Sequence, residues 1–269
     1  MNGKGIAHEY VFDANQHDAE RNRLIALQGV HDSTTKHLLQ RIGLRPGMTC
    51  GEIGAGEGSV ARYMAAAVGP SGRVEALDIN TRFLGAPSPP LEVRRCDITR
   101  DALEPAAYDL IHGRFVMLHV KDMPAALANL WQALKPGGVL LLEEPDFRTA
   151  FPAAGDAEQS AGIERVNAAV LSMYASLGMD PALGARLPSL LLGLGCEDVE
   201  VATDLPLAPG GSGIAAMMGM SIRHLSARLV ETGVASSADI DAYVAATGDA
   251  RMWATYYLTV SAWGKRPVT

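Results

Sequence analysis

The sequence predicts an α/β protein in which a mostly parallel sheet carries a mostly helical cap. Two observations support this prediction. Short apolar runs alternate with segments of helical spacing between residues 46 and 146, and helical spacing predominates between residues 147 and 250. Such alternation is typical of parallel sheets that helices cover on both faces. We therefore expect an N-terminal helical segment (1–45), an α/β core (46–146), cap helices with a sixth strand (147–250) and a final strand of the core sheet (251–269).

Five short apolar runs predict the first strands of the core. Glycine or proline residues interrupt the chain between several of these runs, as expected where regular structure ends. The predicted strands lie at residues 48–54, 74–79, 91–96, 109–113 and 139–143. Between the first two runs, Val60, Met64 and Val68 recur at every fourth position and predict a helix. A second core helix is predicted from Asp122, with several leucines on one face.

Two helices are predicted before the core. The first starts near His17, and the second is capped by Asp32 or Ser33 and ends at Gly43. Helical spacing after the core predicts helices over residues 163–177, 187–194 and 214–229, and a shorter one that begins at Ser236 or Ser237.

The remaining segments of the C-terminal half predict two strands and a loop. Residues 199–203 alternate like a strand, and residues 252–263 are aromatic and β-branched, which favours a final strand. Residues 206–213 are rich in glycine and proline and are the expected mobile loop.

Composition excludes several classes of protein. With 23 Lys and Arg against 30 Asp and Glu, the formal net charge is −7, which argues against a nucleic-acid-binding surface. No apolar stretch approaches the ~18 residues that span a membrane, and the first residues lack the apolar run of a signal peptide. Cys50, Cys96 and Cys196 are far apart, which suits neither disulfides nor zinc and favours a reducing cytoplasm. We expect no metal, no membrane partner and a cytoplasmic protein.

The most informative segment is the turn Glu52–Gly58, which follows the first strand and opens a helix. Its spacing is G-x-G-x-G, and Ser59 stands where a dinucleotide-binding loop would carry its last glycine. Glycines here let the backbone approach a ligand closely at the carboxyl edge of the sheet. An ordinary strand-to-helix turn remains the alternative.

Acidic residues mark the ends of the next two strands. Asp78 ends the second strand and Asp97 follows the third, so that three successive strands place a carboxylate at or near one edge. Asp78 can accept hydrogen bonds from both hydroxyls of a ribose, and Asp97 can accept one from an exocyclic amine.

These segments, together with Tyr108–Ile111 and Leu134–Gly138, resemble the ordered motifs of class I S-adenosylmethionine (SAM)-dependent methyltransferases. The resemblance covers about residues 40–145. It implies a Rossmann-like seven-stranded sheet in the order 3-2-1-4-5-7-6, with the last strand antiparallel. It further implies a SAM site that includes Glu52, Gly54, Gly56, Asp78, Asp97 and Ile98. We add Ala55 and Ile79 from the same segments, and His112 and Arg114 because the fourth strand ends there at the same edge.

The resemblance also assigns parts of the cofactor. Gly54 and Gly56 would line its methionine portion, Glu52 would face the amino-acid end, Asp78 would hold the ribose, and Asp97 with Ile98 would hold the adenine. The backbone of His112 or the side chain of Arg114 would contact the carboxylate of the cofactor. Alternatively, Arg114 pairs with a structural carboxylate. Glu57, a carboxylate inside the turn, has no assigned role.

Residues for catalysis are harder to predict, because methyl transfer mainly requires alignment of the acceptor and exclusion of water. His119 is the predicted general base, with a packed histidine bonded to backbone as the alternative. Glu144 could orient an acceptor or act as a base, and it could equally be a solvated loop residue.

We therefore expect methyl transfer to a small, partly apolar metabolite, with oxygen as the leading acceptor atom. Three alternatives remain open: a reaction of the same fold such as cyclisation, a non-catalytic SAM-binding module, and a nicotinamide dehydrogenase, which Ser59 and Asp97 disfavour. The expected partner is a small-molecule substrate, and the chain could form a homodimer.

Overall fold

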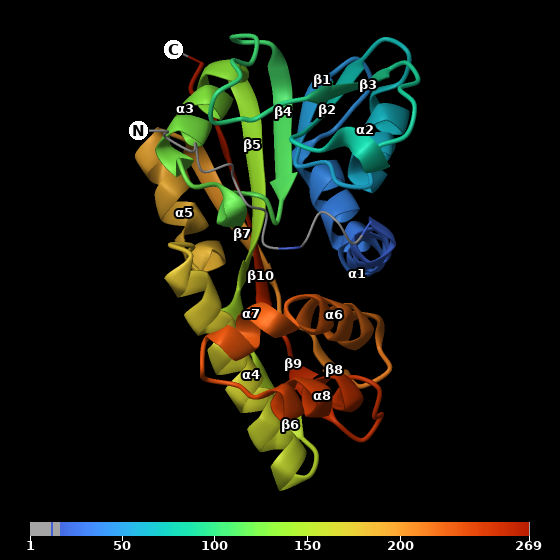
Figure 1. Cartoon of the computed structure of the whole chain (residues 1–269). Coiled ribbons are helices and arrows are strands. Elements are labelled where there is room, and N and C mark those ends of the chain that lie inside the picture. Colours follow the sequence, from blue (N-terminus) through green and yellow to red (C-terminus); the bar gives the residue numbers. More distant parts are fainter. Residues whose placement is uncertain (1–11, 13–16, 269) are drawn as a thin grey trace, which may run out of the picture.

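A seven-stranded sheet forms the centre of the computed structural model, which describes residue 12 and residues 17–268 (Figure 1). Its strand order is β3-β2-β1-β4-β5-β10-β7. The first five strands are parallel, and β10 is antiparallel to both of its neighbours. The predicted order and the antiparallel last strand are confirmed. The strands are β1 (Thr49–Ile53), β2 (Arg73–Asp78), β3 (Leu91–Arg95), β4 (Tyr108–Arg114), β5 (Leu134–Asp146), β7 (Glu197–Asp204) and β10 (Leu258–Lys265).

Helices cover both faces of this sheet (Figure 1). On one face, α1 (His17–Ile42) and α2 (Ser59–Val68) pack through a core that includes Leu39 and Met64. On the other face, α3 (Met123–Ala133) and α5 (Leu183–Leu194) pack through Leu130 and Leu187. These four side chains are fully buried, which gives the sheet the two-sided apolar cover that its unbroken apolar strands require.

The cap lies beyond the carboxyl ends of the parallel strands (Figure 1). It combines α4 (Ala157–Ser176), α6 (Gly213–His224), α7 (Ser226–Glu231) and α8 (Ser237–Ala246) with a three-stranded sheet in the order β6-β9-β8. The small strands are β6 (Phe151–Ala154), β8 (Leu207–Pro209) and β9 (Trp253–Thr255). Short 3-10 turns are η1 (Thr81–Phe83), η2 (Met117–His119) and η3 (Phe147–Thr149). The division of the chain at residues 45, 146 and 250 stays a prediction.

The prediction of two N-terminal helices is wrong, because α1 runs through the proposed caps without a break. No proline interrupts this segment, and the weak helix propensity of Gly29, Asp32 and Ser33 yields to tertiary contacts. Thr35 donates to Glu143 at 2.7 Å, and Asp32 accepts from Arg114 at 2.9 Å. Both contacts attach the middle of α1 to the sheet.

The predicted final strand over residues 252–263 is two strands that belong to different sheets. The chain leaves β9 at Thr255 and enters β10 at Leu258. Thr149 holds this crossing, since its hydroxyl accepts from the amide of Leu258 and its carbonyl accepts from the hydroxyl of Thr255, both at 2.7 Å. A continuous run of β-branched and aromatic residues gave no local signal for the change of sheet.

Two smaller predictions also need correction. The expected loop over residues 206–213 contains β8, which pairs with β9. The single helix predicted over residues 214–229 is broken at Leu225 into α6 and α7. The methionine-rich face of α6 is packed inside the cap, where Met217 and Met218 are buried.

Among the described residues, no helix is both long and apolar enough to cross a membrane. Within the same part of the chain, no group of three or more histidine, cysteine and acidic residues has the arrangement of a metal site. All three cysteines are buried thiols.

Candidate functional site

The glycine turn between β1 and α2 lies at the carboxyl edge of the sheet. Gly54 and Gly56 adopt left-handed backbone conformations, with φ of 61° and 56°. Their amides are held by the end of β2, because Gly54 donates to the Leu77 carbonyl at 2.7 Å and Gly56 donates to Oδ2 of Asp78 at 2.9 Å. A Cβ on Gly54 would stand 2.1 Å from Cγ2 of Val116. The turn therefore requires glycine for both its conformation and its close packing.

Asp78 ends β2 directly beside this turn. Its second carboxylate oxygen accepts from the amide of Asn80 at 2.8 Å, and burial raises the pKa of the Asp78 carboxyl. The next residue, Ile79, leaves 48% of its surface exposed. Ala55 is half-buried, and its amide donates to the carbonyl of Leu77 at 3.3 Å. Ala55, Asp78 and Ile79 thus lie together where β1 and β2 end.

Asp97 and Ile98 follow β3 along the same edge. Oδ1 of Asp97 accepts from the amide and the hydroxyl of Thr99 at 3.0 and 2.6 Å, which fixes the turn after the strand. Ile98 is buried. The amide of Cys96 donates to the Asp78 carbonyl at 2.9 Å, so that the two acidic strand ends are adjacent, as the sequence predicts.

A buried polar row crosses the middle of the sheet beneath α1. Glu52 of β1 faces His112 of β4 in register, and Nδ1 of His112 lies 2.6 Å from Oε2 of Glu52. Nε2 of His112 lies 2.9 Å from Oε1 of Glu143 on β5. Glu143 also accepts from Ser261 of β10 at 2.8 Å and from Thr35 of α1. Glu52, His112 and Glu143 are therefore buried, and each has at least one hydrogen-bond partner within the row.

The two carboxyl groups beside His112 favour its protonated form. Burial lowers the pKa of His112, but the carboxylates of Glu52 and Glu143 oppose it and bring the pKa to about 9. Burial raises the pKa of Glu143, while the bond to His112 outweighs burial and lowers it to about 2. For Glu52, burial dominates and raises the pKa. An imidazolium thus donates to a carboxylate on each side.

Arg114 ends β4 two residues beyond His112. It donates to the hydroxyl of Thr35 at 2.7 Å and to Oδ1 of Asp32 at 2.9 Å. The hydroxyl of Ser59, at the start of α2, donates to the same oxygen of Asp32 at 3.0 Å. The structure thus gives Arg114 a structural carboxylate from α1, which is one of the two readings of the sequence.

Glu57, which sequence reasoning left without a role, links the glycine turn to two helices. It accepts from Arg21 of α1 at 2.9 Å and from Arg62 of α2 at 3.4 Å. Leu24, one helical turn after Arg21, has Cδ2 3.7 Å from the position of a Cβ on Gly56. Helix α1 therefore forms the outer wall of the glycine turn.

Glu144 holds the loop that follows β4. Its carboxylate accepts from the amides of Val116, Met117 and Leu118 at 2.9, 2.7 and 3.4 Å. It is buried, and burial raises the pKa of Glu144 to about 8. The preceding residue of the loop, Phe115, has φ of 57°, a strained conformation for an aromatic residue. Glu144 thus fixes a strained loop, in contrast to the solvated alternative.

His119 ends the η2 turn of this loop. It is half-buried, and burial together with the charge of Arg23 lowers the pKa of His119 to about 4. The imidazole is therefore neutral at physiological pH. Its role as a general base stays a prediction.

One pair of residues escaped sequence reasoning. Nε2 of His31 on α1 lies 2.7 Å from the phenolic oxygen of Tyr257, and both side chains are buried. The ring of Phe115 stands edge-on to His31 at 4.9 Å and to Tyr257 at 5.8 Å. Phe147 continues the cluster, 5.4 Å from Tyr257 and stacked on Tyr174 at 5.2 Å. The pair is separated by 226 residues, and no local motif marks either member.

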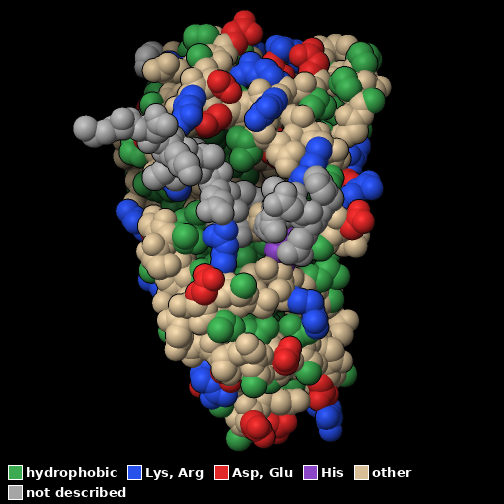
Figure 2. Space-filling model, viewed as in Figure 1, with side chains coloured by type: hydrophobic (Ala, Val, Ile, Leu, Met, Phe, Trp, Pro, Cys, Tyr) green, Lys and Arg blue, Asp and Glu red, His purple; other side chains and the backbone are tan. Residues whose placement is uncertain are grey.

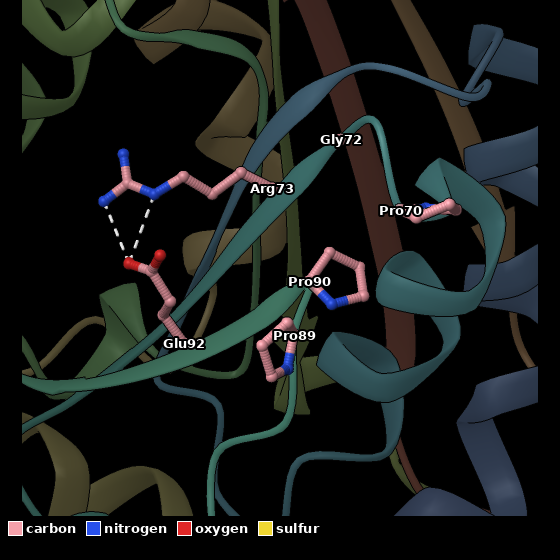
Figure 3. Close-up of a pocket in the computed structure, with 6 residues that line it drawn as sticks. All are labelled: Pro70, Gly72, Arg73, Pro89, Pro90 and Glu92. Atoms are coloured by element: carbon pink, nitrogen blue, oxygen red, sulfur yellow. Dashed lines mark hydrogen bonds and ion pairs between the residues drawn. The ribbon is translucent and has the colours of Figure 1, made fainter.

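A surface hollow of about 270 Å³ lies elsewhere, at the amino ends of β2 and β3 (Figure 3). Arg73 and Glu92 lie side by side in its lining and are joined by hydrogen bonds of 3.2 and 3.0 Å, with Pro70, Pro89 and Pro90 on the other side. The hollow is at the opposite edge of the sheet from the glycine turn. It therefore takes no part in the candidate site.

Comparisons with known proteins agree with this geometry. Residues 18–176 match the family model described as a methyltransferase domain. The chain is 36% identical over 166 residues to methyltransferase str2 of Strobilurus tenacellus, a match that spans 59% of this chain and 57% of that protein. It is 33% identical over 125 residues to the ubiquinone/menaquinone biosynthesis C-methyltransferase UbiE of Bordetella avium, over 43% of this chain and 48% of that protein. The matches thus span about half the length of these curated relatives.

A solved structure confirms the fold. Phosphoethanolamine N-methyltransferase 2 of Haemonchus contortus, in complex with S-adenosyl-L-methionine, is similar with a TM-score of 0.61 at 16% sequence identity. The similarity covers 99% of this chain and 61% of that one. At this identity the likeness concerns the arrangement of helices and strands.

Proposed function

Because this chain belongs to the methyltransferase-domain family of class I SAM-dependent enzymes, we propose that it transfers the methyl group of SAM to an oxygen atom of a small, partly apolar metabolite. The observation that carries the proposal is the carboxyl edge of β1 to β3, where a glycine turn lies against Asp78 and beside Asp97. Open α/β sheets bind ligands outside the carboxyl ends of their strands, where the strand order reverses. Here that reversal lies between β1 and β4.

The residues present at this edge fit the groups that SAM carries. Its ribose hydroxyls and its adenine amine are donors, and Asp78 and Asp97 are acceptors. The exposed side chain of Ile79 offers apolar surface to a purine ring, and Ile98, which is buried in this structure, would contribute at the end of β3. Gly54 has room for no side chain, because Val116 of the loop after β4 packs against it, and this contact joins the glycine turn to that loop.

The amino-acid portion of SAM is proposed to lie between β1 and β4. Glu52 would attract its ammonium group, with Gly54, Ala55 and Gly56 as the backbone wall. The backbone of His112 or the side chain of Arg114 would contact its carboxylate. Bound SAM would supply an electrophilic methyl group on a sulfonium, and the chain's own residues would orient and desolvate the acceptor.

A small acceptor is supported by the surroundings of this edge. Aromatic rings gather there from the residues just after β4 and β5, from α4 and from the residue before β10, and they favour an acceptor with apolar or planar character. Lys and Arg alternate with Asp and Glu on the face seen in Figure 2, without the continuous basic stripe that nucleic acid would require.

Incubation with methyl-labelled SAM and a panel of hydroxyl-bearing metabolites tests the proposal. We expect label in a product whose mass exceeds that of the acceptor by one methylene group. A product of unchanged mass would indicate a cyclisation or rearrangement instead. Binding of SAM without any turnover over the panel would indicate a non-catalytic module.

A further inference from the structure

The candidate site has two halves along one edge of the sheet. The glycine turn and the acidic strand ends lie over β1, β2 and β3. The aromatic cluster lies over β4, β5 and β10, because Phe115 follows the last residue of β4, Phe147 follows the last residue of β5, and Tyr257 precedes the first residue of β10. Helix α1 spans both halves, with Leu24 against Gly56 and His31 against Tyr257.

We propose that His31 and Tyr257 form a proton relay for an acceptor that is a planar, hydroxyl-bearing molecule such as a phenol or an enol. This inference rests on the proposed methyl transfer and names its acceptor class and its proton acceptor. Two independent observations carry it: a hydrogen-bonded pair of ionisable side chains in an apolar cluster, and a strained aromatic residue held against that pair.

The first observation is the burial of a hydrogen-bonded polar pair among aromatic rings. His31 is 4% exposed and Tyr257 is 3% exposed, and their partners in the cluster are aromatic rings. Hydrophobic residues of similar volume would fill this space without the cost of burying polar groups. Buried ionisable groups in such surroundings are enriched at functional sites.

The second observation is the strain at Phe115. Its amide donates to the Glu143 carbonyl at 2.8 Å, and Glu144 holds the next three amides, so that the left-handed conformation is enforced from β5. This conformation places the ring edge-on to both members of the pair. Local strain persists where surrounding contacts enforce it, and it is concentrated at functional sites.

Burial is the main reason that both members of the pair are uncharged. Burial, and then the charge of Arg114, lower the pKa of His31 to about 3, and burial raises the pKa of Tyr257. The imidazole is therefore neutral and the phenol is protonated at neutral pH. The ionisable groups that face the pair are Asp32, Arg114 and Glu143 around His31, and Arg23, Arg114, Tyr174 and Asp204 around Tyr257.

The proton balance of the relay is complete. As the acceptor oxygen gains the methyl group, its O–H bond breaks and the electron pair of that bond stays on oxygen. The released proton passes to the oxygen of Tyr257, whose own proton passes to Nε2 of His31. The positive charge leaves sulfur and ends on the imidazolium, so that the net charge of the buried site does not change. Because the acceptor oxygen becomes strongly acidic as it gains the methyl group, an imidazole of low basicity can still take its proton.

Two phenols of different acidity test the relay. 4-Nitrophenol is largely ionised in mildly alkaline buffer and needs no base, whereas 4-ethylphenol must lose its proton during transfer. We expect the wild type to methylate both. His31→Ala and Tyr257→Phe should lower kcat for 4-ethylphenol by about 10²-fold to 10⁴-fold and change it for 4-nitrophenol by less than about threefold. With 4-ethylphenol the variants should gain a rate that rises tenfold per pH unit, because only ionised acceptor then reacts.

Matched controls separate this role from a structural one. His37 lies on the same helix as His31 but is exposed, and Tyr256 is the buried neighbour of Tyr257 in the sequence. His37→Ala and Tyr256→Phe should both keep wild-type rates. His119→Ala tests the alternative base. Should His31→Ala fail to fold, Tyr257→Phe removes a single oxygen and carries the test. Nitrogen NMR of His31 gives a readout without turnover: Nε2 should be unprotonated and hydrogen-bonded at pH 7, and its signal should shift in Tyr257→Phe.

The outcomes are distinct. Equal losses on both phenols, no loss on either, or the alkaline signature in His119→Ala alone would overturn the relay and leave methyl transfer intact. A wild type that binds S-adenosylhomocysteine and methylates neither phenol would overturn the acceptor class. A wild type that binds no S-adenosylhomocysteine would overturn the proposed function as well.

Discussion

Replacing His112 with glutamine should destabilise the protein in a pH-dependent way. The pKa of His112 rises from 6.5 to about 9 between the two carboxylates of the polar row. At about 1.36 kcal/mol for each pH unit, this difference contributes about 3 kcal/mol to the free energy of unfolding. Because the pKa is higher in the folded state, the contribution is full below pH 6.5 and is lost as pH rises through about 9.

Urea denaturation of the wild type and of His112→Gln at pH 6 and pH 10 measures this contribution. The variant should be less stable by about 3 kcal/mol at pH 6 and by less than about 1 kcal/mol at pH 10. The difference between the two proteins cancels the titration of cysteines and tyrosines, which both share. His37→Gln, on the exposed side of α1, should match the wild type at both values. A stability difference that stays constant from pH 6 to pH 10 would refute the protonated, doubly paired histidine.

Three further substitutions test other parts of the site. Gly54→Ala should be less stable than Gly85→Ala by about 1–3 kcal/mol in urea denaturation, because both have positive φ but only the first meets a side chain; equal losses would contradict the close packing. Glu144→Ala should lose about 1–3 kcal/mol, because buried amides lose their acceptor, and a variant as stable as wild type would show that the loop holds itself. Arg21→Ala should change stability by less than about 1 kcal/mol, since Arg21 is 57% exposed, and a larger loss would give its contact with Glu57 more weight than a surface pair has.

Local patterns in the sequence predict the sheet and its ligand-binding edge. The apolar runs and glycine turn give the strands, and the positions of Asp78 and Asp97 follow because carboxyl ends of parallel strands meet at one edge. The order of the strands follows from the family resemblance, which rests on motifs in the same core. These features depend on contacts between residues that are close in sequence or in successive strands.

The remaining features depend on contacts that no local pattern encodes. His31 meets Tyr257 across 226 residues, and Thr35 meets Glu143 across 108. The change of sheet after Thr255 likewise depends on Thr149, a residue of a distant segment. The burial of Glu144 could not be predicted from its neighbours in sequence, because its three amide donors lie in the loop after β4, 26–28 residues away. A covarying pair in aligned relatives is the signal that could have found His31 and Tyr257.

Calorimetric titration with S-adenosylhomocysteine tests the central claim, that the carboxyl edge of β1 to β3 binds the adenosyl portion of SAM. We predict binding by the wild type, a loss of affinity of about 10-fold to 100-fold in Asp78→Ala and in Asp97→Ala, and no loss in Asp241→Ala, an exposed residue of the cap. Unchanged affinity in the first two variants would contradict the claim.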